Sequence, residues 1–265
     1  MVYGILTMIN FAHGDFFMVG AFLCFIAAAL IGLPFVPSLL LSMTGVALLG
    51  VLVERVAYKP LRHAPRVSAI ITALGVGIFL ENFVLALSPY PKHIPPIMSN
   101  TNWTIGGVTV SSLQVIIICL SVVLMAVLDY IVQRTKVGMA MRAISWDKNI
   151  VPLMGVPLDT VISVTFALGS GLGGAAGVMY GMAYPVIDPY MGIIVGWKAF
   201  ISAVIGGIGN IRGAMIGAYI LGAVEVLVAA SLPSTYRDLI AFVLLLALLL
   251  WRPHGILGKP RVQKV

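Results

Sequence analysis

Long apolar segments, separated by short polar or proline-bearing stretches, dominate the chain. Most of them approach the ~20 residues that a helix needs to cross a membrane, and their lengths favour helices over strands. The pattern predicts about eight helices, at residues 14–31, 37–56, 68–87, 113–132, 161–184, 193–208, 214–230 and 238–251. The predicted fold class is therefore all-α: a polytopic integral membrane protein whose transmembrane helices include broken, glycine-rich segments.

The composition supports a single membrane domain. Hydrophobic residues make up 60% of the 265 residues and charged residues only 9%, which is too little polar surface for a water-soluble protein. Eight spans with short connections leave no room for a separate soluble domain. We therefore expect one transmembrane domain over residues 1–265.

The basic residues predict the orientation, because cytoplasmic loops of membrane proteins are enriched in Lys and Arg. One set of alternate loops holds Arg55, Lys59, Arg62, Arg66, Arg134, Lys136, Arg142, Lys148, Arg212, Arg252, Lys259, Arg261 and Lys264, and the other holds only Lys92 and Arg237. We expect the loops near residues 60 and 145 and the C-terminus in the cytoplasm, and residues 88–112 outside.

Two of the connections are long enough to have structure of their own. In the outer segment 88–112, the run TIGGVTV is typical of a small hairpin with a Gly-Gly turn. In the inner segment 133–160, the run MAMRAISWDKNIVPLMG predicts a short amphipathic helix that ends at Gly155 and Pro157.

The sequence contains no enzyme signature that we could identify. No Lys is followed by Ser or Thr, so the chain lacks the phosphate-binding loop of ATPases. None of the four His residues begins an H-E-x-x-H motif, and no G-x-S-x-G elbow occurs. We predict a protein that is not an enzyme, with no metal and no cofactor, which takes any energy from ATP on a separate subunit.

Glycine recurs every fourth residue in the run FALGSGLGGAAGVMYGMAYP. Gly169, Gly173, Gly177 and Gly181 form one bare stripe along a helix, on which another backbone can approach closely. Tight structural packing is the favoured interpretation. A moving interface between two helix bundles is the alternative.

A second glycine-rich run, GGIGNIRG, separates two predicted helices. Gly206, Gly207, Gly209 and Gly213 make a continuous helix unfavourable there, and backbone freed from helical bonding must be buried in protein or line a wet cavity. Gly206, Gly207, Gly209 and Asn210 are therefore candidates for a broken helix at the translocation path. The run MIGAY that follows echoes MVGAF near the N-terminus, but two five-residue matches are more simply coincidence than an internal repeat.

The polar run NFAHGD interrupts the first apolar segment. Asn10, Phe11, His13, Gly14 and Asp15 are candidates for a broken helix beside a translocation path, as in many transporters. Asp15 would lie in the first turn of the following helix, where a negative charge is favoured, and His13 would cap or bond the freed backbone. A structural break with satisfied hydrogen bonds is the alternative.

Two carboxylates, Glu81 and Glu225, lie inside apolar runs. A lone charge in the bilayer is costly, so each is expected to face a partner or water. A position near the outer membrane interface is the favoured interpretation, and a role in a proton relay is the alternative.

Taken together, several segments resemble one transporter family. They are NFAHGDFFMVGAF, ERVAYKPLR with ITALGVGIFL, RAISWDKNIVPLMGV, GWKAFISAVIGGIGNIRGAMIGAYILGAVEVL and WRPHGILG. In this order they are similar to the permeases of ABC importers for branched-chain amino acids. Members of that family usually have a further transmembrane helix before the segment that matches MVYGILTMINFAHG, so the resemblance implies that this first helix is missing here.

The resemblance also implies the partners and the cellular location. We expect a second permease subunit, two cytoplasmic ATPase subunits and an extracytoplasmic solute-binding protein, assembled in the inner (plasma) membrane of a bacterium. Arg142, Ala143, Asp147 and Gly155 would then belong to a coupling helix that docks on the ATPase.

Three other functions stay open at this point. A related permease for urea or short amides would share the motifs. An ion-coupled secondary transporter would use Glu81 and Glu225 and work without ATP. A scaffold subunit without transport activity would tolerate changes in NFAHGD.

Overall fold

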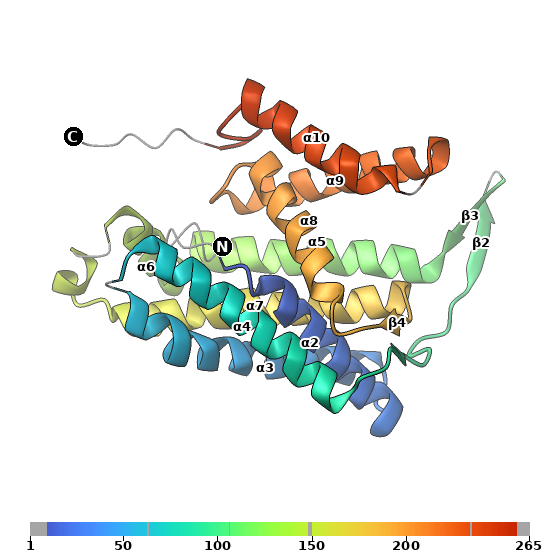
Figure 1. Ribbon diagram of the computed structural model, residues 1–265, viewed down its shortest axis with the longest axis horizontal. Coiled ribbons are helices and arrows are strands. Elements are labelled where there is room, and N and C mark those ends of the chain that lie inside the picture. The colour runs from blue at the N-terminus through green and yellow to red at the C-terminus, as the bar shows by residue number, and fades with distance from the viewer. Residues whose placement is uncertain (1–9, 63, 106, 148–149, 234, 259–265) are drawn as a thin grey trace.

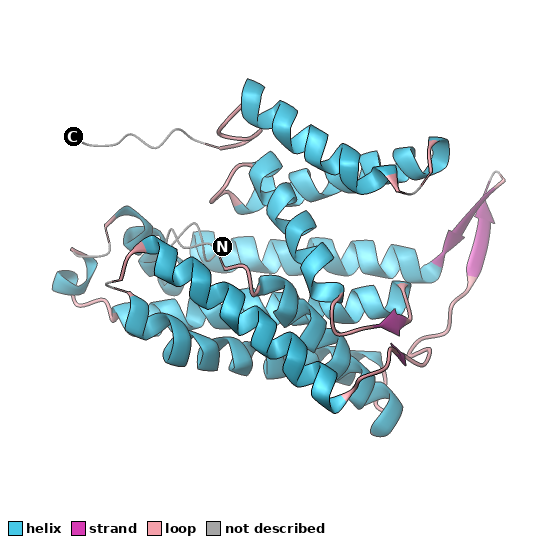
Figure 2. Ribbon diagram, viewed as in Figure 1, coloured by secondary structure: helices cyan, strands magenta, loops and turns pink. Residues whose placement is uncertain are grey.

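Helices make up nearly all of the structure, a computed structural model that describes residues 10–62, 64–105, 107–147, 150–233 and 235–258 (Figure 2). The α-helices are α2 (His13–Phe25), α3 (Phe35–Val53), α4 (Arg66–Leu87), α5 (Ser112–Arg134), α6 (Lys136–Trp146), α7 (Leu158–Ala183), α8 (Met191–Gly206), α9 (Ile211–Ser231) and α10 (Tyr236–Trp251). A π-helical turn, Ile26–Leu30, extends α2, and the turns Glu54–Tyr58 and Lys59–Leu61 extend α3. Each predicted apolar helix therefore has a counterpart.

Fewer helices are long enough to cross a membrane than the eight that were predicted. Within the described residues, six are long and apolar enough, namely His13–Leu30, Phe35–Leu61, Val67–Leu87, Ser112–Arg134, Leu158–Ala183 and Ile211–Ser231. Helices α8 and α10 have 16 residues each, below the ~20 that a perpendicular span needs. The protein is thus a mostly helical, multi-pass membrane protein, and its described residues include six candidate spans by length and composition.

Proline and polar caps set where several helices begin. Pro34, Pro65 and Pro157 directly precede α3, α4 and α7, because proline has a fixed φ and no N–H to leave unbonded at a helix start. Helix α5 begins with a capping box, in which Ser111 and Gln114 each accept from the other's backbone N–H.

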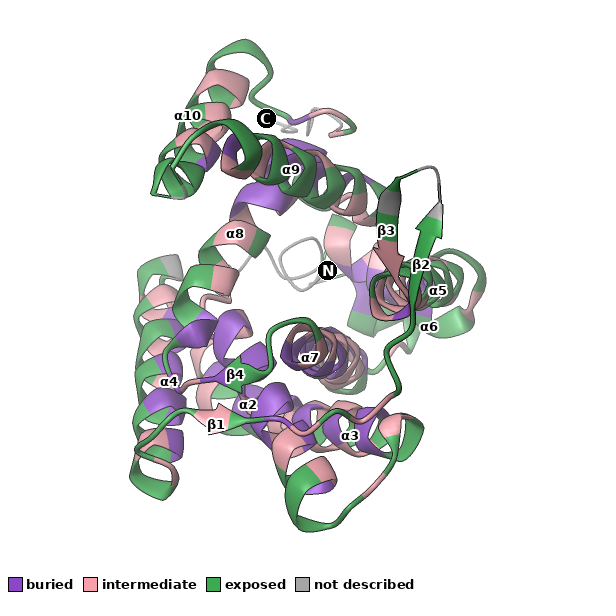
Figure 3. Cartoon of the chain, turned by 90° about the vertical axis from the view of Figure 1, so that its right-hand side faces the viewer, coloured by how far each residue is buried: buried purple, intermediate pink, exposed green. Residues whose placement is uncertain are grey.

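Helix α7 lies at the centre of the molecule and is the most buried of the spans. It packs against α2 and α3, with the buried side chains of Phe16, Val46 and Phe166 among the contacts (Figures 1 and 3). Close approach is possible because α7 presents glycines to both neighbours. This packing fixes where α2 begins, and with it the position of the polar run NFAHGD.

Helices α8, α9 and α10 form a second group, at the top of Figure 1. Ile201, Ile205, Leu221 and Ala241 make its core. The ammonium of Lys198 on α8 lies 2.9 Å from Glu225 Oε1 on α9 and 3.2 Å from Asp238 Oδ1 on α10, so one cation joins all three helices.

The two long connections lie at opposite ends of the long axis (Figure 1). At one end, β2 (Asn102–Ile105) pairs antiparallel with β3 (Val108–Ser111), as the Gly-Gly pattern predicted. Beside it, β1 (Lys92–His93) pairs with β4 (Val186–Ile187), which joins the outer segment to the connection between α7 and α8. At the other end lie α6 and the turn Val151–Met154.

The predicted amphipathic helix in 133–160 is shorter than expected. Helix α6 ends at Trp146, and Val151–Met154 forms a separate 3-10 turn before Gly155. Pro152, which the sequence interpretation left out of account, cannot lie in a helix interior and therefore excludes a continuous helix as far as Gly155. The predicted basic tail after residue 258 lies in residues 259–265, which are outside the described residues, and the prediction of a missing first helix concerns a segment before Met1 and stays a prediction.

Candidate functional site

The beginning of α2 contacts four other parts of the molecule, and the polar run NFAHGD supplies the contacts. Asn10 Oδ1 accepts a hydrogen bond of 2.8 Å from the Tyr58 hydroxyl, at the end of the α3 extension. Tyr58 is 3% exposed and packs on Phe166 of α7, so its hydroxyl needs this buried acceptor. Asn10 therefore joins the start of α2 to the α3–α7 pair.

Next to Asn10, the aromatic ring of Phe11 packs against two aromatic rings of α8. Phe11 lies with its ring 5.7 Å from Trp197 and 6.3 Å from Phe200, measured between centroids. Trp197 is 45% exposed, so the aromatic group forms part of the surface of the described chain. The rings offer an apolar wall beside the polar break.

Gly14 allows α2 and α8 to touch through their backbones. A Cβ added to Gly14 would lie 2.9 Å from the carbonyl carbon of Gly192 and 3.0 Å from the Cα of Gly196. These distances leave no room for any side chain, so the two helices approach here as closely as helices can.

The expected role of His13 as a cap is not seen. His13 is the first residue of α2, Ala12 is its N-cap, and no side chain within the described residues bonds to the cap. Its Cε1 instead lies 3.5 Å from the place where a Cβ on Gly173 would be. The imidazole packs over the bare backbone of α7.

Asp15 lies in the first turn of α2, as predicted, and it is not alone. Its carboxyl group lies between Gly77 of α4 and Gly192 of α8, with Oδ1 3.0 Å from the Cβ position of Gly192. The side chain of Glu81, one turn further along α4, lies close to it. Asp15 is 5% exposed and Glu81 is 8% exposed, so both carboxyl groups are buried against neighbouring helices.

The second predicted break, between α8 and α9, is covered by the C-terminal segment. Gly207 and Gly209 have φ values of 104° and 92°, which a residue with a side chain rarely adopts. The backbone N–H of Ile256 donates to the carbonyl of Ile205 over 2.9 Å, and that of Leu257 donates to Gly206 over 3.1 Å. The freed carbonyls are therefore satisfied within the protein.

Asn210 has two roles at the same break. Its Oδ1 accepts from the backbone N–H of Gly213 over 3.1 Å and so caps α9, and its Nδ2 donates to the Leu257 carbonyl over 2.9 Å. The break and the C-terminal segment are thereby joined into one unit. The printed polar contacts of this break are thus with the C-terminal segment and α9, whereas the NFAHGD run contacts α3, α4, α7 and α8.

The glycine stripe of α7 is buried along its whole length. Gly169, Gly173, Gly177 and Gly181 are all buried, and Gly177 lies against α2, where an added Cβ would be 2.7 Å from the backbone nitrogen of Ala21. Gly181 lies against the outer segment, at Ile94. The stripe is part of the close α2–α7 contact.

The four residues of the inner segment that were predicted to couple the chain to an ATPase lie along α6 and at the end of the 3-10 turn that follows it. Arg142 donates to the carbonyl of Val132 at the end of α5, and Ala143 packs with the cluster that holds α6 against α7. Asp147 ends α6, and its carboxylate accepts from the backbone N–H of Ile150. Gly155, with φ of 79°, follows the 3-10 turn.

The same segment exposes large apolar side chains, which the sequence analysis did not single out. Trp146 is 88% exposed, Leu153 is 86% exposed and Met154 is 77% exposed. Exposed apolar groups that are clustered in a loop, rather than along a span, indicate a surface that binds another molecule.

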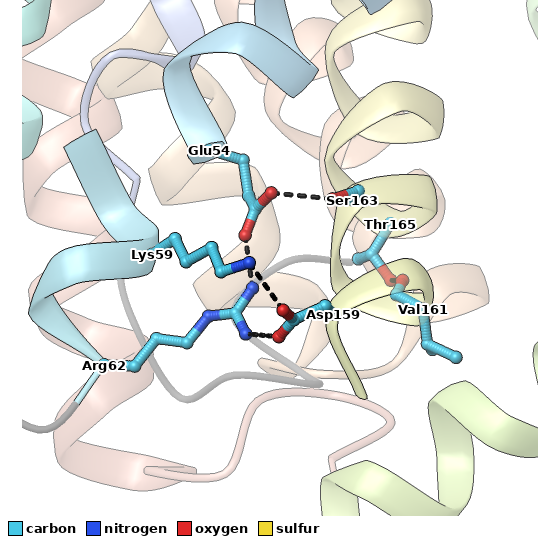
Figure 4. A network of polar contacts seen from close by, with 7 residues as sticks. All are labelled: Glu54, Lys59, Arg62, Asp159, Val161, Ser163 and Thr165. Atoms are coloured by element: carbon cyan, nitrogen blue, oxygen red, sulfur yellow. Dashed lines mark hydrogen bonds and ion pairs between the residues drawn. The ribbon is translucent and has the colours of Figure 1, made fainter. Parts of the chain in front are cut away.

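A charged network joins the end of α3 to the beginning of α7 (Figure 4). Arg62 forms ion pairs with both Glu54 and Asp159, and Lys59 lies 2.6 Å from Asp159. The Glu54 side chain is fully buried, and the Ser163 hydroxyl donates to its second oxygen over 2.7 Å. Both oxygens of the buried carboxylate therefore have partners, as a buried charge requires.

Sequence reasoning missed this network, and it also missed the partner of Glu225. The basic residues near 60 were assigned to topology, and Glu54 and Arg62 are eight residues apart, beyond the three or four residues that separate neighbours on a helix face, so no local spacing indicated their ion pair. Lys198 lies inside an apolar run, where a charge needs a partner, and this feature could have indicated its ion pair with Glu225.

The chain matches one protein family over nearly its whole length. The family is described as "Branched-chain amino acid transport system / permease component", and its profile matches residues 1–249. The high-affinity branched-chain amino acid transport system permease protein BraD of Pseudomonas aeruginosa is 40% identical over 278 residues, which cover 100% of this chain and 91% of that protein.

Two further relatives carry similar names. The high-affinity branched-chain amino acid transport system permease protein LivH of Escherichia coli K12 is 40% identical, with 100% of this chain and 90% of that protein covered. A probable branched-chain amino acid transport permease protein LivH of Methanocaldococcus jannaschii is 27% identical, with 94% and 82% covered. No solved structure matches the chain.

Proposed function

The chain belongs to the family of branched-chain amino acid transport permeases, and we propose that it is the membrane-spanning subunit of an ATP-driven importer for these amino acids. The full-length similarity to BraD and LivH is the observation that carries this proposal. The six apolar helices agree with it, since a permease must span the membrane.

The proposed assembly follows the resemblance. It has a second permease subunit, two cytoplasmic ATPase subunits and an extracytoplasmic binding protein, in the inner membrane of a bacterium. The chain itself would form one transmembrane domain over residues 1–265. The lack of a phosphate-binding loop in the sequence supports a separate ATPase.

We place the translocation path beside the start of α2. Phe11, Trp197 and Phe200 form an apolar wall next to Asn10 and His13, and apolar side chains of leucine, isoleucine or valine would find contacts there. In the alternating-access step, the group α8–α10 would move as a body relative to α2–α7. The bare contact between Gly14 and Gly192 lies between the two groups and would act as the pivot.

The inner segment would transmit the movement. Trp146, Leu153 and Met154 are exposed at one end of the molecule and would insert into a groove of an ATPase subunit. Arg142 and the packed face of α6 hold this segment against α5 and α7, so a pull on it would reach the spans.

A substrate competition experiment tests the proposed specificity. The complete system, reconstituted in proteoliposomes with ATP inside, takes up labelled leucine in the presence of excess unlabelled competitor. We expect isoleucine and valine to reduce leucine uptake strongly and urea or acetamide to leave it unchanged. Inhibition by urea or acetamide, with none by valine, would replace the proposal with the urea or amide permease.

One observation favours a second candidate, an ion-coupled transporter. The buried carboxyl groups of Asp15 and Glu81 lie close together, and ionisable side chains inside the spans of a transporter often belong to a proton path. Glu225 no longer supports this candidate, because it is paired with Lys198. The second candidate predicts uptake without ATP.

A further inference from the structure

A cavity of about 570 Å³ opens between the end of α3 and the beginning of α7, next to the network of Figure 4. Arg55 and Lys59 line it at the level of the helix ends. Val51, Val164 and Ala167 line it one to two turns closer to the middle of the helices. Asp159, Thr160 and Ser163 complete the lining, so the end of the cavity carries two basic groups and one acidic group, and its walls are mainly apolar.

The positive charge of the cavity is not cancelled within the protein. Lys59 and Arg62 share Asp159, while Glu54 is already bonded to Arg62 and Ser163. Arg55 is exposed and forms no ion pair or hydrogen bond with any residue that the structure describes. Among the described residues no carboxylate is paired with this guanidinium at the edge of the cavity, and its five N–H donors suit an anion.

The neighbouring surface shows what kind of molecule can reach the cavity. On the same stretch of α3, Leu48, Leu52 and Val56 are 72%, 58% and 68% exposed. In a membrane-spanning helix such side chains face lipid, so the cavity opens next to the acyl chains of the bilayer. Its basic end lies at the end of two spans, where lipid headgroups are found.

We propose that this cavity binds an anionic phospholipid, with the headgroup phosphate at Arg55 and Lys59 and an acyl chain along Val51, Val164 and Ala167. Basic pockets between spans are suited to such headgroups, because the phosphate accepts charge-assisted hydrogen bonds and the apolar walls cover the chain. The lipid would fill the groove between α3 and α7 and stabilise their contact. The proposal does not depend on the transported substrate.

Lipid titrations on the purified protein test the proposal. The chain, purified in detergent with whatever subunits copurify, is titrated with phosphatidylglycerol or with phosphatidylcholine while its thermal unfolding is followed. We expect phosphatidylglycerol to raise the unfolding temperature and phosphatidylcholine to have little effect. In the variant Arg55→Gln we expect the apparent affinity for phosphatidylglycerol to fall roughly tenfold, which corresponds to about 1.4 kcal/mol.

Arg134→Gln is the matched control, because Arg134 is also an exposed arginine at the end of a span, that of α5, but does not line the cavity. It should bind phosphatidylglycerol like the wild type. Equal affinities for wild type and Arg55→Gln would overturn the proposal. So would full stabilisation by inorganic phosphate alone, which would indicate a site for a free anion, or loss of a copurifying protein from Arg55→Gln with lipid binding unchanged, which would indicate a protein interface.

Discussion

At the scale of single residues, the absence of a side chain decides how α2 and α7 meet. Gly177 faces the carbonyl of Phe17 and the backbone nitrogen of Ala21, so any side chain would push the two helices apart. Adding atoms to a packed core costs ~1–3 kcal/mol of stability even where neighbouring side chains can adapt. At Gly177 the neighbouring atoms belong to the backbone of α2, which adapts less easily than a side chain. This contact therefore contributes to the stability of the whole bundle.

We predict that Gly177→Leu lowers the unfolding temperature of the purified protein strongly, or prevents its accumulation in the membrane. Gly222→Leu on α9 is the control, because a Cβ at Gly222 would meet nothing within 4 Å. The measurement is thermal unfolding in detergent, together with the amount of protein in isolated membranes. Equal stability of the two variants would contradict the close α2–α7 packing.

Residue-level prediction from the sequence succeeded where the cause was local. The place of Asp15 in the first turn of α2 followed from the charge preference of helix starts. Its partner Glu81 could not be predicted, because the two residues meet only after α4 has packed against α2. The bond from Tyr58 to Asn10 was missed for the same reason.

At the scale of elements, the inner segment is the part on which coupling depends. Gly155 has φ of 79° and a Cβ there would meet nothing within 4 Å, so a substitution acts through backbone strain and not through a clash. Strain of this kind costs ~1–3 kcal/mol and is larger for β-branched residues, whereas Asn adopts this conformation more readily.

We predict that Gly155→Val lowers the number of leucine molecules imported per ATP hydrolysed several-fold, and that Gly155→Asn has a much smaller effect. Gly32→Val is the control, because Gly32 has φ of 75° and equally open surroundings but lies in the connection before α3. Uptake and ATP hydrolysis are measured on the same proteoliposomes. If Gly155→Val and Gly32→Val keep the wild-type ratio alike, the inner segment does not couple the subunits.

Helix positions were predictable because apolar runs and the prolines before α3, α4 and α7 mark them directly. The length of α6 was wrong because amphipathic periodicity was followed through Pro152. Whether α8 and α10 cross the membrane is a question of packing as much as of length, since a short helix can be held by its neighbours. Lys198 of α8 forms ion pairs with Glu225 of α9 and Asp238 of α10, and these ion pairs connect the two short helices to each other and to α9.

At the scale of the whole molecule, the β2–β3 hairpin and α6 lie at opposite ends of the bundle. The bias of Lys and Arg toward alternate loops predicts which end faces the cytoplasm, and no contact within the chain determines this.

Cysteine labelling tests this orientation. Cys24 and Cys119 would first be replaced by alanine, and single cysteines would then be introduced as Thr109→Cys and Trp146→Cys, at two exposed positions.

We expect a membrane-impermeant maleimide to label the cysteine at position 109 in intact spheroplasts, and the cysteine at position 146 only after the membrane is opened. Labelling of position 146 alone in intact spheroplasts would reverse the predicted orientation. Labelling of both would mean that the two connections are on one side, against their separation in the structure.

The central claim is that this chain transports branched-chain amino acids with energy from ATP on partner subunits. The most direct test is uptake of labelled leucine into proteoliposomes that contain the chain, its partner permease and its ATPases, with binding protein outside and ATP either inside or omitted. We predict uptake only when both ATP and binding protein are present. Uptake that persists without ATP, and that is lost in Asp15→Asn or Glu81→Gln, would contradict the importer and indicate an ion-coupled transporter.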